Sequence, residues 1–234
     1  MWDCAKVRRT AALLREAASL GETALASSLS AEDMVLTDLI VTVRLPISVF
    51  PLETGRLAPE TLGMIDKITE RWGIPVDIYR PNGDAVAAYV TANGRDAFYE
   101  SVALRKACCG IRKVEPLKRA LAGKAAWVTG QRRDQSVTRT ELHDREFDEV
   151  HGLEKFNPLT DWSWADVLAY VAARDVPINP LHARGYPSIG CDPCTRAIRP
   201  GEDPRAGRWW WERGTAKECG LHLPKIVVEQ YGAR

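Results

Sequence analysis

Short apolar segments alternate with helical ones along the first half of the chain, and this alternation restricts the possible folds more than any other feature. The segments TALASS (23–28), ISVFPL (47–52), VDIY (76–79) and AAWVTG (125–130) are typical of buried strands. Helical apolar spacing is found over 31–43, 59–72, 84–94 and, as one long run, about 95–121. The alternation predicts an α/β fold, with a parallel sheet covered by helices on both faces.

The loops that follow the predicted strands carry most of the polar motifs. They are SSLSAED (27–33), LETGR (52–56) and TGQRRDQS (129–136). In parallel sheets, ligands bind beyond the carboxyl ends of the strands, so we expect these loops to converge on one crevice. In the first loop, the start of a helix offers free backbone N–H groups to an anion. The same residues can be a simple capping box, with Ser30 as N-cap and Asp33 three residues later.

The last quarter of the chain differs in character. SWADVLAYVAARD (163–175) reads as a capped amphipathic helix, and six prolines between 177 and 204 predict mostly loop beyond it. We therefore expect one domain, in which 1–185 form the α/β body and 186–234 form a cysteine-rich arm with a mobile tail. The chain shows no internal repeat.

Composition narrows the function classes. The 234 residues include 32 basic and 31 acidic side chains, and a net charge of +1 gives no general field for a polyanion. We therefore predict no nucleic-acid partner. Charges interrupt the apolar start of the chain, and no run of 18 apolar residues occurs. We predict a cytoplasmic protein with no membrane partner.

Four of the six cysteines fall into two close pairs, Cys108–Cys109 and Cys191–Cys194. Four thiolates suit zinc or an iron–sulfur cluster. The adjacent pair favours a four-iron cluster, which offers each thiolate its own iron. Two alternatives without a metal remain, namely buried apolar cysteines for the first pair and a thioredoxin-like redox pair for the second.

Cys219 stands apart in KECGLH, between Lys217 and His222. Nearby cations can lower the pKa of a thiol, and a following glycine lets the segment move, so Cys219 is a candidate nucleophile. It could equally be an inert cysteine. The run of three tryptophans at 209–211 is more typical of an anchor for an irregular segment than of a platform for a base.

Taken together, these motifs resemble the sulfonucleotide reductases, and within them the cluster-containing adenylyl-sulfate (APS) reductases of assimilatory sulfate reduction. The matching stretches include SLSAEDMVL, LETGRLAPET, CCGIRKVEPLKRAL, WVTGQRRDQS, CDPCTRAIRPGEDPRAGRWWWE and KECGLH. The resemblance implies an adenine nucleotide alpha hydrolase-like fold and an oxidoreductase of cysteine biosynthesis. The substrate would be adenosine 5′-phosphosulfate (APS), which is reduced to sulfite and AMP.

The resemblance also implies roles for particular residues. One [4Fe–4S] cluster per chain would be held by Cys108, Cys109, Cys191 and Cys194. Cys219 would be the catalytic nucleophile, forming an S-sulfocysteine that thioredoxin or a glutaredoxin-like dithiol protein then reduces. The substrate-binding positions would be Ser30, Leu52, Thr54, Lys113, Gly130, Arg139, Arg205, Arg208 and His222. We further expect a homo-oligomer.

Three rival functions remain at this stage. A nearer one is a reductase that uses the 3′-phosphorylated substrate, PAPS, or both nucleotides. Another is an ATP-dependent tRNA thiolase, which should carry a basic RNA surface and an S-G-G-x-D-S loop that this sequence lacks. The third is a non-catalytic binding module stapled by a metal, in which every cysteine is structural.

Overall fold

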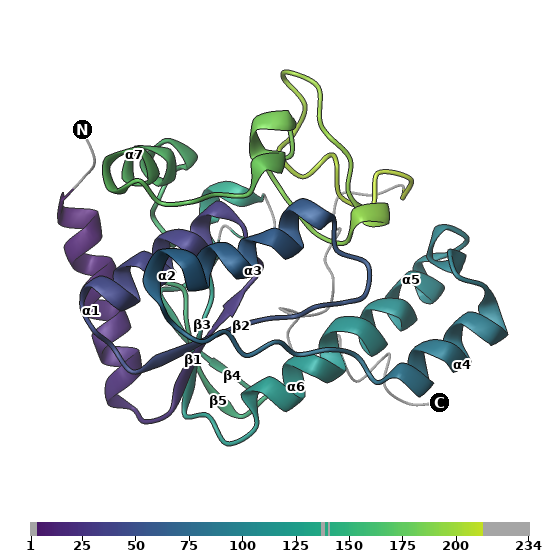
Figure 1. Cartoon of the computed structure of the whole chain (residues 1–234), viewed down its shortest axis with the longest axis horizontal. Coiled ribbons are helices and arrows are strands. Elements are labelled where there is room, and N and C mark those ends of the chain that lie inside the picture. The colour runs from purple at the N-terminus through teal and green to yellow at the C-terminus, as the bar shows by residue number, and fades with distance from the viewer. Residues whose placement is uncertain (1–3, 137–138, 140, 213–234) are drawn as a thin grey trace.

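A five-stranded sheet lies between two layers of helices in the computed structural model, which describes residues 4–136, 139 and 141–212 (Figure 1). The strands are β1 (Thr23–Ser27), β2 (Ile47–Pro51), β3 (Ala126–Val128), β4 (Arg145–Asp148) and β5 (Leu153–Phe156). Their order across the sheet is β2-β1-β3-β5-β4. All neighbours pair in parallel except β4, which runs antiparallel at one edge. The predicted α/β fold is confirmed.

The helices pack on both faces of the sheet, because successive side chains of a strand point to opposite faces. They are α1 (Cys4–Ser19), α2 (Ala31–Thr42), α3 (Pro59–Trp72), α4 (Gly83–Asn93), α5 (Val102–Cys109), α6 (Glu115–Leu121) and α7 (Trp164–Arg174). Leu25 and Val128 turn to one face and pack with buried side chains of α1, α2, α3 and α7. Ala24, Phe50 and Trp127 turn to the other face, against α6. Side chains that alternate along each strand therefore build two separate cores.

The predicted helix at 163–175 is confirmed, with its cap. The Ser163 hydroxyl accepts a hydrogen bond from the Asp166 backbone N–H at 3.1 Å, and the Asp166 carboxylate accepts one from the Ser163 N–H at 2.7 Å. This reciprocal arrangement pairs two of the N–H groups that the start of a helix leaves without partners.

Two other element predictions are wrong in part. The segment 76–79 is not a strand, because it forms only isolated bridges, Val76 with Val49 of β2 and Tyr79 with Leu52 just beyond it. The long helical run is broken into a 3-10 turn (Ala97–Tyr99), α5, a π-helical turn (Gly110–Val114) and α6. A π turn inserts an extra residue and is frequent at functional sites. Here it directly follows the vicinal cysteines and contains Lys113.

The predicted capping box at the start of α2 is also wrong. Ser30 is the N-cap by backbone position, but its side chain makes no capping hydrogen bond. Asp33 instead accepts hydrogen bonds from the backbone N–H and the hydroxyl of Ser28, both at 2.6 Å. The carboxylate therefore closes the loop before the helix.

The arm after α7 is largely loop, as predicted, with short 3-10 turns at Pro180–Arg184 and Asp192–Cys194. Its division from the body at residue 185 and the oligomeric state stay predictions. No helix among residues 4–136, 139 and 141–212 is long and apolar enough to cross a membrane.

Candidate functional site

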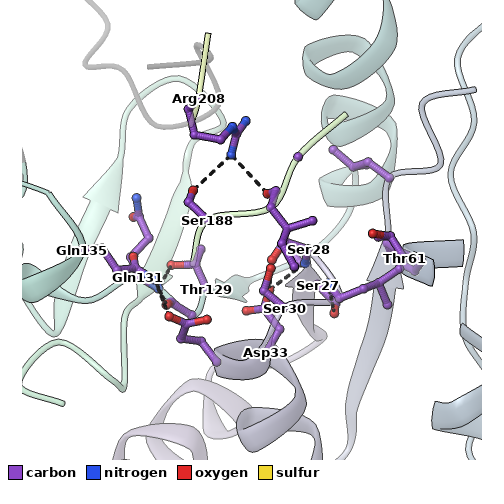
Figure 2. A pocket seen from close by; sticks show the side chains of 18 of the residues that line it. Ser27, Ser28, Ser30, Asp33, Thr61, Thr129, Gln131, Gln135, Ser188 and Arg208 are labelled. Carbon is purple, nitrogen blue, oxygen red and sulfur yellow. Dashed lines mark hydrogen bonds between the residues drawn. The ribbon is translucent and has the colours of Figure 1, made fainter. Parts of the chain in front are cut away.

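A cavity of about 320 Å³ opens where the parallel strands end. That volume lies in the range of small-molecule sites, and the position is the one expected for a ligand of a parallel α/β sheet. The predicted substrate positions that are described all line it, namely Ser30, Leu52, Thr54, Lys113, Gly130, Arg139, Arg205 and Arg208. Figure 2 shows hydroxyl and carboxamide side chains from the loops after β1 and β3 gathered on one side of Arg208. The loops thus converge as the sequence predicted.

The floor of the cavity is the loop after β1, held in an unusual conformation. Leu29 has a φ of 63°, in the left-handed region, and is almost fully buried, and its N–H donates to the Ser27 hydroxyl at 3.2 Å. Such conformations cluster at binding sites, where the surrounding structure must hold them. The two hydrogen bonds from Ser28 to Asp33 supply part of that hold.

Asp33 is a buried acid with an altered ionisation. Burial raises the pKa of Asp33 to about 6, although the hydrogen bonds from Ser28 and from the Gly130 backbone oppose the shift. A Cβ added to Gly130 would lie only 2.3 Å from an Asp33 carboxylate oxygen. Glycine is therefore required where the β3 loop crosses the start of α2.

Next to Asp33, Glu32 forms a buried ion pair with Arg132 at 2.9 Å, and both side chains are 5% exposed. The pair joins α2 to the loop after β3. His182 from the arm reaches the same helix start, where its Nε2 accepts a hydrogen bond from the Ala31 N–H at 3.2 Å. Its Nδ1 lies 2.9 Å from the Tyr186 carbonyl oxygen, so Nδ1 carries the proton. Burial lowers the pKa of His182, which keeps the ring neutral and able to accept.

The opposite wall is cationic. Arg208 is 7% exposed and donates to the Ile189 carbonyl at 3.1 Å and to the Ser188 hydroxyl at 3.4 Å (Figure 2). Its guanidinium also stacks over the Trp209 ring. Lys113, Arg139 and Arg205 line the same cavity. Guanidinium and ammonium groups held in a partly enclosed space are suited to phosphate or sulfate oxygens.

The two cysteine pairs lie together beside this wall. Cys191 and Cys194 are buried with Phe98 and Trp209, and Cys108 packs against them. Each of Cys108, Cys109, Cys191 and Cys194 is a free thiol. Chain segments 82 positions apart are joined here by local contacts such as Tyr99, whose hydroxyl donates to the Pro193 carbonyl at 2.7 Å.

The thiols differ in their ionisation. Burial raises the pKa of Cys194 to about 12, and the neighbouring Cys191 and Cys109 add to the rise. Burial acts in the same direction on Cys191, but Lys113 and a hydrogen bond with the Thr54 hydroxyl, at 3.3 Å, outweigh it and lower its pKa. A positively charged metal core is the usual means of ionising such a group of thiols together. Cysteine sulfur is also the donor that iron–sulfur clusters take, so the chemistry of this donor set is compatible with one.

Within the described part of the chain, no group of three or more Cys, His, Asp or Glu side chains is arranged to hold one metal ion. When a single zinc ion has tetrahedral cysteine ligands, their sulfur atoms lie about 3.8 Å from one another. A four-iron cluster distributes its thiolates over four irons, so it needs no such close group. Cys219 and His222 lie outside the described residues, and so does the whole KECGLH motif.

Several cavity residues were not found by sequence reasoning. They are Glu32, Asp33, Gln131, Gln135 and Trp164. The signal available for the first two was a pair of acids in the first turn of an otherwise apolar helix. Such acids usually serve the helix dipole, so only the fold reveals that they are buried.

The fold and the cavity define an α/β nucleotide-binding protein, and comparison with known proteins identifies the family. Residues 22–197 match the phosphoadenosine phosphosulfate reductase domain. The adenosine 5′-phosphosulfate reductase of Burkholderia cepacia is 63% identical over 95% of this chain and 90% of its own length. That of Allochromatium vinosum is 58% identical over 89% of this chain and 81% of its own. The chain belongs to the sulfonucleotide reductase family and is an oxidoreductase.

Solved structures agree. The phosphoadenylyl-sulfate reductase of Candida auris, in a phosphate complex, superposes with a TM-score of 0.69 at 26% identity, over 81% of this chain and 90% of that one. The FMN adenylyltransferase of Candida glabrata superposes with a TM-score of 0.57 at 13% identity, over 97% and 81%. The second likeness shows the fold alone.

Proposed function

We propose that this reductase acts on adenosine 5′-phosphosulfate and releases sulfite and AMP through an S-sulfocysteine on Cys219. The observation that carries the proposal is the single cavity lined by the described residues expected to bind substrate. Relatives named adenosine 5′-phosphosulfate reductase, at 50–63% identity over most of the chain, support the choice of nucleotide.

In the first step, the Cys219 thiolate attacks the sulfur of the sulfate group and the bond to the phosphate oxygen breaks. AMP leaves with that oxygen, and the protein keeps a thiosulfonate. In the second, a thiolate of thioredoxin or a glutaredoxin-like protein attacks the Cys219 sulfur and sulfite leaves. The second thiol of the dithiol then restores the Cys219 thiolate. Two electrons pass from the dithiol, which becomes a disulfide, to the sulfur released as sulfite.

The cationic wall suits the first step. Nucleophile, sulfate and phosphate are all anionic, so the reaction needs fixed positive charge where negative charge grows on the leaving phosphate. Arg208 is held by Ile189 and Ser188 and needs little reorganisation to serve. Lys113, Arg139 and Arg205 complete the clamp. Leu52, Thr54 and Gly130 would contact the nucleoside, and Ser30 a phosphate oxygen.

Cys108, Cys109, Cys191 and Cys194 would hold a [4Fe–4S] cluster. When bound, the cluster would supply fixed charge beside the clamp and would carry no electrons in the reaction. Lys113 would balance that charge, because its positive charge already lowers the pKa of Cys191. Iron and acid-labile sulfide analysis on anaerobically purified protein tests this. About four of each per chain are expected, and zinc or no metal would contradict it.

Trapping of the intermediate tests the catalytic role. The protein is incubated with sulfur-35-labelled APS and no reductant, and then digested. Label is expected on the peptide that contains Cys219, and it should be released by thioredoxin. The exposed Cys4 provides a matched control, since Cys4→Ser should label normally whereas Cys219→Ser should not. Turnover retained by Cys219→Ser would refute the mechanism.

PAPS is the second candidate substrate, because the Candida auris structure is that of a phosphoadenylyl-sulfate reductase. Steady-state comparison of kcat/KM for APS and PAPS decides between them. We expect a clear preference for APS. A preference for PAPS would reverse the substrate assignment while leaving the role of Cys219 intact.

A further inference from the structure

Gln131 contributes a buried polar atom to the cavity, its side-chain oxygen. The residue follows Gly130 in the loop after β3, lines the cavity and is only 6% exposed. Its side-chain oxygen is fully covered and accepts no hydrogen bond from the described residues. Its backbone N–H, in contrast, donates to the Thr129 hydroxyl at 3.4 Å.

Its neighbours in the same loop are paired. The Gln135 amide nitrogen donates to Glu32 at 2.9 Å and to the Gly130 carbonyl at 3.4 Å. The Thr129 hydroxyl donates to the Asn157 side-chain oxygen at 2.6 Å. Figure 2 shows Gln131, Thr129 and Gln135 along one side of the cavity. A buried polar oxygen without a partner destabilises a protein, and most buried polar groups are paired. A ligand in the cavity would supply the partner that the described residues do not.

The chemistry of a nucleotide limits what that partner can be. Its phosphate and sulfate oxygens face the cations described above. Its base suits the apolar wall that Phe50, Leu117 and Trp127 contribute to the cavity. The ribose lies between base and phosphate, and Gln131 lines the cavity that both would occupy.

We propose that Gln131 binds a ribose hydroxyl of the nucleotide and so helps to select the substrate. A hydroxyl both donates and accepts, and a carboxamide offers one acceptor and two donors. Rotation about the last side-chain torsion exchanges its two ends, so either end can turn to the ligand. This inference rests on the proposed function, because it requires an adenine nucleotide in the cavity.

The proposal is tested by removing a ribose hydroxyl from the nucleotide and, separately, the carboxamide from Gln131. AMP, 2′-deoxy-AMP and 3′-deoxy-AMP are titrated calorimetrically into the full-length wild type and into Gln131→Met, which keeps the length of the side chain but removes both polar ends. In the wild type, removal of the contacted hydroxyl should weaken binding about tenfold. In Gln131→Met, AMP itself should bind about tenfold more weakly, and the matching deoxynucleotide should then bind within about twofold of AMP.

Gln135→Met is the matched control, since Gln135 lines the same cavity but is paired within the protein. It should leave the ratio of AMP to deoxy-AMP affinity at the wild-type value. Gln131→Met should not lower the urea midpoint of the ligand-free protein, because it removes an unpaired buried group, whereas a purely structural role predicts a lower midpoint.

Equal affinity ratios in wild type and Gln131→Met for both deoxynucleotides would overturn the inference. That outcome differs from failure of the proposed function. If the wild type binds AMP and labels at Cys219 but the ratios are equal, only the role of Gln131 is lost. If the wild type binds no AMP, the nucleotide site is wrong, and the role of Gln131 is rejected with it.

Discussion

Replacement of Asp33 by asparagine should change how the stability of the protein depends on pH. Asp33 is 4% exposed, and burial raises its pKa from 3.8 to about 6. Between these two pH values the folded protein binds a proton that the unfolded chain has already lost. The contribution of Asp33 to the free energy of unfolding is therefore fully present below pH 3.8 and is lost as the pH rises through about 6.

The size of the effect follows from the pKa difference. Each pKa unit corresponds to about 1.4 kcal/mol, so the full effect is about 3 kcal/mol. The wild type should lose about 2.5 kcal/mol of it relative to Asp33→Asn between pH 4 and pH 7, because part is already lost at pH 4. Little solvent screening applies, because the carboxylate is buried against Ser28 and the Gly130 backbone. Asparagine does not titrate, so it removes this pH dependence and leaves that of the other groups in place.

Urea unfolding followed by tryptophan fluorescence, at half-unit steps between pH 4 and pH 7.5, measures the effect. The quantity of interest is the wild-type free energy of unfolding minus that of the variant. It should fall as the pH rises and level off above about pH 7. Asp66→Asn, at an exposed acid on α3, is the control for the loss of a carboxylate outside the cavity. A flat or rising difference for Asp33→Asn would refute the reasoning.

Two further substitutions probe the same floor of the cavity. Arg132→Met should lower the free energy of unfolding by about 3–5 kcal/mol in urea titrations, because it leaves the Glu32 carboxylate buried without its cation, and Arg132→Lys should recover part of the loss. A loss below about 1 kcal/mol would contradict this account. Gly130→Ala should weaken AMP binding at least about tenfold in calorimetry, because its Cβ would collide with Asp33. Gly63→Ala, with open space around the added methyl group, should leave AMP affinity unchanged, and equal effects of the two changes would count against the collision.

The body of the fold could be predicted from local patterns because its first three strands are apolar and helices lie between them. β1, β2 and β3 were found in this way, together with the loops that carry the cavity. β4 and β5 were not found. β4 has the sequence REFD with alternating exposed and half-buried side chains, so it offers no apolar run. Its place depends on pairing with β5 and on cross-strand ion pairs such as Lys155–Glu146 at 2.7 Å.

In the candidate site, too, local motifs could be predicted from the sequence, and contacts between distant segments could not. Cations and cysteines could be named from motifs, because their chemistry is carried by the residue type and its neighbours in sequence. The environment of Asp33 could not be predicted, since it depends on Ser28 and Gly130 meeting across two loops. Likewise, nothing in the sequence distinguishes Gln131, whose side-chain oxygen has no partner among the described residues, from Gln135, whose side chain is paired.

The described chain ends close to the cysteines, and the contacts there explain why cysteines and cavity form one unit. Arg105 of α5 is 2% exposed and stacks over the Trp209 ring. Its guanidinium donates two hydrogen bonds to the Glu212 carboxylate, the longer of them at 3.2 Å. Trp209 in turn carries the stacked guanidinium of Arg208 on the cavity wall. The helix that ends in Cys108 and Cys109 is thus tied to the arm through one aromatic ring shared by two arginines. A change at that ring would therefore disturb both Arg208 on the cavity wall and the cysteines that pack with Trp209.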